Sequence, residues 1–210
     1  MAATSAEEIA AAAARLVADE GMEYAAAKRK AARAFGRHGG RSAELPSNEQ
    51  VEDQVREHLA LFHADTQPAE LRALRELALV WMERLAEFRP HLSGAVWRGT
   101  ATRLSALHLD LYCDDEKAIE IALINRGVDY DAASLPDPRG GQPRTLLSLA
   151  ARCPALGEVV TLFLTVLDHD DLRGALQPDA RGRAWRGDAA ALRRLLAAYD
   201  AAGAAAAAAD

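Results

Sequence analysis

The positions best suited to chemistry gather between residues 92 and 112. Gly94 stands in a turn, and a glycine turn that opens a helix lets backbone N–H groups meet a phosphate. From Ser105 to Cys113 leucines alternate with other residues, which predicts a strand with one face on a core and the other available for chemistry. His108 and Asp110 share that second face, where an imidazole and a carboxylate could hold a metal ion such as Mn²⁺.

These residues resemble the signature of the polymerase-beta-type nucleotidyltransferases. In that family an apolar residue precedes Gly-Ser, a run such as Arg-Gly-Thr-Ala follows, and Ser-Asp-x-Asp-Leu comes later on a strand. Here Gly94-Ala95 stands in place of Gly-Ser, and the two metal-binding aspartates fall on Ala106 and His108. The nucleotide-binding residues that the resemblance implies are Gly94, Ala95, Arg98, Gly99, Thr100 and Ser105.

The resemblance also implies that the metal site of the family has been lost. The third acid of the family comes from a later strand, and the strand expected at 159–167 carries Thr161, Phe163 and Thr165 on one face. Mg²⁺ prefers oxygen ligands, and none of the three expected carboxylates is in place. We therefore expect a catalytically degenerate protein that binds a nucleotide or a nucleic acid, RNA rather than DNA.

An active nucleotidyltransferase is the alternative, with His108 and Asp110 as a displaced metal site and with Mg²⁺ or Mn²⁺ as cofactor in that case alone. The plainer interpretation makes Asp110 a solvated carboxylate at the end of a strand and His108 a partly buried residue that hydrogen-bonds the backbone, and the residue pattern favours it. His58 and His63 are not expected to share a helix face, so we do not expect them to form a metal pair.

A basic segment at residues 28–41 is the second feature that could bind a partner. It contains no acid, although the whole chain has a formal charge of −6. A helix end followed by a Gly-rich basic loop suits the phosphate backbone of RNA or DNA, and a helix-turn-helix-like DNA-binding regulator is a further alternative. A solvated helix C-terminus explains the segment equally well. The candidate nucleic-acid-binding residues are Lys28, Arg29, Lys30, Arg33, Arg37 and Arg41.

Periodicity predicts an α+β fold with three regions. Residues 1–88 read as helices, including one that Ser47 and Gln50 open as a capping box. Residues 89–200 read as a small mixed sheet covered by helices, which is the nucleotidyltransferase type that the resemblance implies. Residues 201–210 are almost all alanine and are expected to be a disordered tail.

Composition limits the remaining classes. Cys113 and Cys153 have no metal-ligand spacing and are read as reduced thiols. The N-terminus lacks a cationic region, and its polyalanine stretch is shorter than a signal or membrane segment needs, which favours a cytoplasmic protein with no membrane partner. A homodimer or a protein partner is left open.

Overall fold

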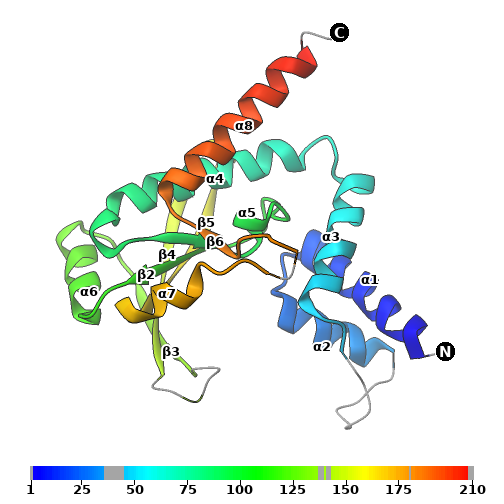
Figure 1. Cartoon of the computed structure of the whole chain (residues 1–210), viewed down its shortest axis with the longest axis horizontal. Helices are drawn as coiled ribbons and strands as arrows, with labels where there is room; N and C mark the ends of the chain where they lie inside the picture. Colours follow the sequence, from blue (N-terminus) through cyan, green and yellow to red (C-terminus); the bar gives the residue numbers. More distant parts are fainter. Residues whose placement is uncertain (1, 36–44, 137–139, 141–142, 180, 208–210) are drawn as a thin grey trace. The chain divides into compact units, whose positions relative to one another are not determined.

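The chain divides into two compact units, and the division falls within α4 (Gln67–Arg84). The structure is a computed structural model that describes residues 2–35, 45–136, 140, 143–179 and 181–207 (Figure 1). The first unit comprises residues 1–71 and 100–105, and the second comprises residues 72–99 and 106–210. This division comes earlier in the chain than the change of pattern at residue 88.

The first unit is helical. It contains α1 (Ala2–Glu20), α2 (Tyr24–Ala34), α3 (Asn48–Phe62) and the start of α4. Its core is built from small and β-branched side chains at helical spacing, which lets the helices approach closely; fully buried members are Ile9, Ala13, Ala27, Val51 and Val55. The capping box is confirmed, because the backbone N–H of Gln50 donates to the Ser47 hydroxyl at 3.1 Å and the backbone N–H of Ser47 donates to Oε1 of the Gln50 side chain at 2.7 Å.

The second unit is built on a mixed sheet of six strands in the described residues, in the order β3-β4-β5-β2-β1-β6 (Figure 1). The strands are β1 (His91–Ser93), β2 (Leu107–Tyr112), β3 (Asp131–Leu135), β4 (Arg144–Cys153), β5 (Glu158–Leu167) and β6 (Arg186–Gly187). The connections are η1 (Ala86–Phe88), α5 (Gly94–Arg98), α6 (Glu116–Asn125), η2 (His169–Asp171), α7 (Leu172–Ala175) and the final α8 (Ala189–Ala207).

The register of the sheet separates an apolar face from a polar one. Strand β2 pairs antiparallel with β1 and parallel with β5, so that Ser93, His108 and Phe163 stand side by side. His91, Asp110 and Thr165 form the next row on the same face. Side chains alternate along each strand, and the opposite face presents the fully buried Leu92, Leu107, Leu109, Leu111, Leu162 and Leu164.

The α+β class expected from the sequence is confirmed, and alanine-rich sequence near both ends of the described part is helical. Helix α1 already begins at Ala2, since alanine has the highest helix propensity. The same property extends α8 to Ala207, so most of the expected disordered tail is helical, and residues 208–210 lie outside the described part. Within the described residues, no helix combines the length and the apolar character needed to cross a membrane.

Candidate functional site

The Gly94 turn joins β1 to α5 and lies at the edge of the polar sheet face. Gly94 is exposed and has φ +68°, a backbone conformation that glycine adopts without strain. A Cβ at this position would lie 3.3 Å from Cδ2 of His108. Among the described residues, Ser93 forms no side-chain cap on α5, because its hydroxyl donates instead to the His108 carbonyl oxygen at 3.5 Å.

His108 lies beside this turn, as the sequence motif implies. Its side chain is half-buried, and its ring stacks on Phe163 with the centroids 5.2 Å apart and the planes 26° apart. Phe163 lies on β5, the strand on which the resemblance led us to look for a third acid. The imidazole is therefore held in one orientation next to the glycine turn, on a part of the face where carboxylates were expected in an active enzyme.

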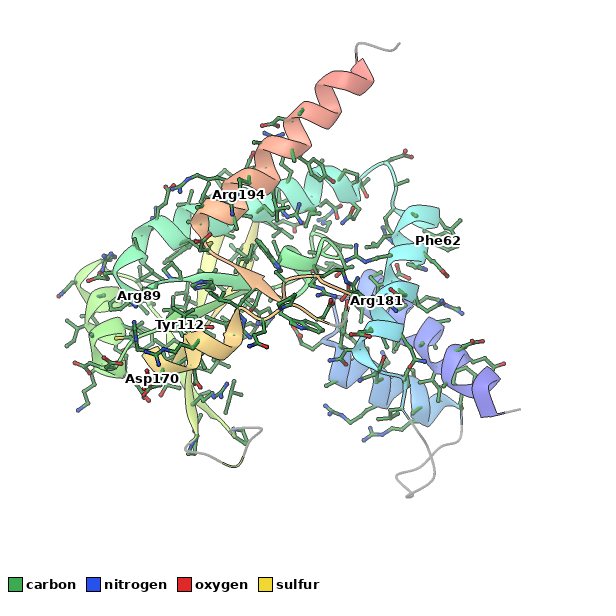
Figure 2. All side chains as sticks on the ribbon, viewed as in Figure 1. Phe62, Arg89, Tyr112, Asp170, Arg181 and Arg194 are labelled. Atoms are coloured by element: carbon green, nitrogen blue, oxygen red, sulfur yellow. The ribbon has the colours of Figure 1, made fainter. Side chains whose placement is uncertain are left out.

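Asp110 is not the solvated carboxylate that the plainer interpretation expected. It is 8% exposed, and its Oδ2 lies 2.9 Å from Nη1 of Arg186, which comes from β6. The same Nη1 donates to the hydroxyl of Tyr112 at 2.8 Å, and Tyr112 is itself buried on β2 (Figure 2). Asp110 is buried because β6 pairs with β1 and places the guanidinium of Arg186 against the Asp110 carboxylate.

Burial dominates the electrostatics of this cluster. Burial raises the pKa of Asp110 above 3.8, although Arg186, Ser93 and the two nearby imidazoles of His108 and His91 act in the opposite direction. Burial also raises the pKa of Tyr112, against the attraction of Arg186. Asp110 and Arg186 are thus tied to each other, and a metal ion could use Asp110 only by displacing the guanidinium.

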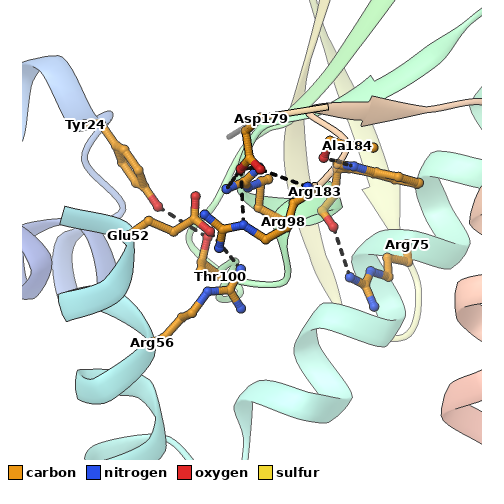
Figure 3. A network of polar contacts seen from close by, with 10 residues as sticks. Tyr24, Glu52, Arg56, Arg75, Arg98, Thr100, Asp179, Arg183 and Ala184 are labelled. Atoms are coloured by element: carbon orange, nitrogen blue, oxygen red, sulfur yellow. Dashed lines mark hydrogen bonds and ion pairs between the residues drawn. The ribbon is translucent and has the colours of Figure 1, made fainter. Parts of the chain in front are cut away.

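The side chain of Arg98 is buried and contacts residues of the second unit. Its side chain is 6% exposed, and its Nη1 lies 3.3 Å from Oδ2 of Asp179 (Figure 3). The guanidinium also stacks over the ring of Trp185, 4.4 Å from the ring centroid. Asp179 also accepts hydrogen bonds from Arg183, through its backbone amide at 2.8 Å and its guanidinium at 3.1 Å. Gly99 ends α5 in the left-handed conformation at φ +80°.

The segment Thr100–Ser105 belongs to the first unit, where Thr100, Ala101 and Thr102 are buried and the two residues after them are exposed. The Thr100 hydroxyl lies 3.3 Å from the Tyr24 hydroxyl, and that of Thr102 donates to the carbonyl oxygen of Ala18 at 3.3 Å (Figure 3). The Ser105 hydroxyl accepts a bond from the Thr102 amide at 3.0 Å and closes a turn. Of the six residues expected to bind a nucleotide, Gly94 and Ala95 alone lie at the opening of the helix next to His108.

The basic segment is only partly described. Lys30 pairs with Glu20 at 2.6 Å, and Lys28 donates to Asn48 Oδ1 at 2.7 Å, with its pKa lowered by burial. Arg29 and Arg33 are exposed one helical turn apart on α2. The remaining candidates, Arg37 and Arg41, lie outside the described residues.

The expectation that His58 and His63 form no metal pair rested on their spacing along one helix, and the structure brings the two rings together, with their centroids 5.6 Å apart. His63 follows the end of α3 as its C-cap, and the chain turns there, so both imidazoles reach Asp19 at the end of α1. Sequence spacing within one helix could not show this, because the third member is 39 residues away from His58.

A groove of about 780 Å³ in the second unit lies between α4 and the loop regions after β4 and α6. Val80 and Trp81 line it, with Arg84 and Asp129 among its charged members. None of the residues of the Gly94 turn lines this groove, so its volume does not bear on the candidate nucleotide site.

The geometry therefore offers one strand–turn–helix–strand unit with an exposed glycine turn, an oriented imidazole and a carboxylate already neutralised by arginine. Comparison of the chain with protein-family models, with curated proteins and with solved structures finds no match.

Proposed function

We propose that the chain binds the phosphates of a nucleotide at the Gly94 turn, without a catalytic metal pair and without nucleotidyl transfer. The observation that carries this proposal is the exposed Gly94 at the start of α5, next to the oriented ring of His108. The signature that resembles the nucleotidyltransferases includes this turn and His108, which supports the proposal by analogy of sequence.

Backbone N–H groups supply the first part of such a site. The first turn of a helix has amides without intrahelical partners, and Ser93 leaves them uncapped by its side chain. Since Gly94 has no Cβ, a phosphate oxygen can approach the backbone there more closely than at any other residue type. The His108 imidazole can donate a further hydrogen bond to the same phosphate.

Charge supplies the second part. Nucleotidyltransferases need divalent ions because their carboxylates and the triphosphate are both negative. Here the corresponding positions hold Ala106 and His108, and Asp110 is paired with Arg186 at 2.9 Å. Phosphate binding on this face therefore meets little carboxylate repulsion, and we expect it to be independent of Mg²⁺.

Thermal unfolding with ATP, GTP, CTP or UTP tests the proposal, each in EDTA and in Mg²⁺. A nucleotide at about 100 times its dissociation constant should stabilise the protein by roughly 2.7 kcal/mol, in EDTA as well as in Mg²⁺. Gly94→Ala should lose this shift, because the new methyl group would lie against the His108 ring. Gly127→Ala is the matched control, since Gly127 has φ +65° and its Cβ would meet nothing within 4 Å.

Two outcomes would replace the proposal. A shift that requires Mg²⁺ or Mn²⁺, together with incorporation of label from an alpha-labelled nucleotide that is lost in His108→Ala and Asp110→Ala, would favour the active nucleotidyltransferase. The absence of a shift in melting temperature with every nucleotide would rule out the nucleotide site and leave the basic helix α2 as the candidate binding surface.

Helix α2 supports nucleic-acid binding as a second candidate function. Arg29 and Arg33 point to solvent from one face of α2, and neighbouring Lys28 and Lys30 already have partners in the fold. Two exposed guanidinium groups at this spacing suit contacts to consecutive phosphates of RNA.

A further inference from the structure

Three potential metal ligands converge in the first unit, at the C-terminal ends of α1 and α3. Asp19 lies in the last turn of α1, His58 lies just before the last turn of α3, and His63 follows that helix directly. Nε2 of His58 lies 3.0 Å from Oδ1 of Asp19, and Nε2 of His63 lies 2.9 Å from the same oxygen. All three ligand atoms lie within 4.8 Å of one another.

These separations are close to those of a metal-bound set. Zinc binds imidazole nitrogen and carboxylate oxygen at about 2.0–2.2 Å, which places neighbouring ligands of a tetrahedron roughly 3.3–3.5 Å apart. The two nitrogen–oxygen distances are a few tenths of an ångström shorter than that. Small rotations of the side chains would therefore open the space for an ion without a change in the backbone.

The electrostatic surroundings favour a cation. Two helices end at this cluster, and a helix C-terminus carries a partial negative charge from its unpaired carbonyl groups. The Asp19 carboxylate adds a full negative charge beside these carbonyl groups, because an ordinary aspartate is ionised at neutral pH.

The cluster is both ordered and accessible. The His58 ring packs against Phe62 with the centroids 4.7 Å apart, which restricts its orientation; the Phe62 side chain itself projects from the end of α3 (Figure 2). The side chains of His58, His63 and Asp19 are 13%, 28% and 44% exposed. An ion could enter from solvent and keep a water molecule in its remaining coordination position.

We propose that Asp19, His58 and His63 form a binding site for one divalent transition-metal ion of the zinc type, which links the ends of α1 and α3. The donor set of two imidazoles and one carboxylate suits Zn²⁺ better than Mg²⁺ or Ca²⁺, which prefer oxygen ligands alone. This site is independent of the nucleotide site, because it uses other residues and another ligand.

Calorimetric titration of the tag-free full chain with Zn²⁺ at pH 7.5, after treatment with EDTA and dialysis, tests the proposal. We expect one Zn²⁺ per chain and a rise in melting temperature on binding. Titration with Mg²⁺ should give neither. Replacing the Zn²⁺ by Co²⁺ should give the visible absorption of a tetrahedral or five-coordinate site.

Three ligand variants and one control decide the assignment. His58→Gln, His63→Gln and Asp19→Asn should each weaken Zn²⁺ binding by more than the roughly 10–100-fold that follows loss of a group that only orients a ligand. His63→Gln is the most informative variant, because His63 lies after the helix and is partly exposed, so the fold tolerates the change. His169→Gln, in the second unit, should bind Zn²⁺ as the unaltered chain does.

Absence of Zn²⁺ binding by the unaltered chain would overturn the proposal and leave the three residues as a hydrogen-bonded cluster. Binding that persists in His58→Gln/His63→Gln, with the apo variant still folded, would overturn it equally, because the ion would then have other ligands.

Discussion

Replacement of Arg186 by methionine should destabilise the second unit strongly at neutral pH and weakly at acidic pH. Arg186 is the partner of Asp110 across β6 and β2, with 2.9 Å between Nη1 and Oδ2. Without the guanidinium, the carboxylate of Asp110 must either stay charged in a buried site or take up a proton. Methionine has a similar volume to the stem of arginine, so the main change is the loss of charge.

The magnitude follows from the burial of the charge that remains. Removal of one partner of a fully buried ion pair costs about 3–5 kcal/mol. The Asp110 side chain is 12% exposed, so water relieves a part of this cost, and we expect about 2–4 kcal/mol at pH 7. Asp110→Asn should cost less than about 1 kcal/mol, because the neutral amide can still accept from Arg186, whose own side chain is 24% exposed.

The raised pKa of Asp110 determines the direction in which the stability of the protein changes with pH. The folded-state pKa of Asp110 is raised above 3.8 by burial, so the folded protein binds this proton more tightly than the unfolded chain does. Stability from this group is therefore complete at low pH and is lost as the pH rises through the folded-state pKa. Loss of Arg186 removes an interaction that lowers this pKa, so the loss of stability becomes larger and extends to higher pH.

Urea denaturation between pH 4.5 and pH 8 measures these differences for Arg186→Met, Asp110→Asn and the double variant. The double variant should recover to within about 1 kcal/mol of the unaltered chain and lose the pH dependence of Arg186→Met. The reasoning is refuted if Arg186→Met costs the same at pH 5 as at pH 8, or if Asp110→Asn costs as much as Arg186→Met.

The other predictions concern Gly187, Asp179 and helix α2. In Gly187→Ala the new Cβ would overlap the indole ring of Trp97, whose Nε1 donates to the carbonyl oxygen of Ala184 at 2.9 Å and holds the ring in place. We expect the free energy of unfolding, measured by urea denaturation, to fall by about 1–3 kcal/mol. A change of less than about 0.5 kcal/mol would contradict this. The pKa of Asp179 is lowered from 3.8, first by the Arg183 backbone hydrogen bond, so its stabilising effect is present above that pH and is lost as the pH falls through the folded-state pKa. Asp179→Asn should therefore unfold with less dependence on pH between 7 and 3, and an unchanged slope would argue against this role. Arg29→Glu/Arg33→Glu should weaken RNA binding by tenfold or more in fluorescence anisotropy and reduce its salt dependence, whereas equal binding by this variant would exclude α2 as the RNA surface.

Local pattern was sufficient to identify most elements of the fold. The alternation around Leu109 predicts β2 because side chains of a strand alternate between a buried and an accessible face, and the structure has this strand. Strand β3 begins only at Asp131, since Val128 still belongs to the turn after α6, where its backbone amide donates to the carbonyl oxygen of Leu123 at 3.0 Å. Such boundaries depend on tertiary pairing, here of β3 with β4, which local pattern does not contain.

The sequence predicted only those contacts of the candidate site that join residues of the same local motif. Gly94 and His108 are brought together by a single turn and two neighbouring strands, so their proximity follows from the order of the elements. Arg186 comes from β6, a strand of two residues that has no recognisable alternation. Its pairing with Asp110 therefore left no signal in the sequence. The convergence of His58 with Asp19 is of the same kind, because it depends on how α1 packs on α3.

Under the proposed function, two features of the β2 face act in the same direction: the absence of carboxylates at Ala106 and His108, and the pairing of Asp110 with Arg186. Each carboxylate removed from a triphosphate site removes a metal ligand, and at the same time removes a charge that repels the phosphates. With Ala106 and His108 in the place of acids and Arg186 on Asp110, the arrangement that disfavours metal-dependent transfer is also one that permits phosphate binding without metal. Under the proposed function, the requirement for a divalent ion, rather than nucleotide affinity as such, is therefore the quantity that distinguishes a nucleotide-binding protein from an enzyme.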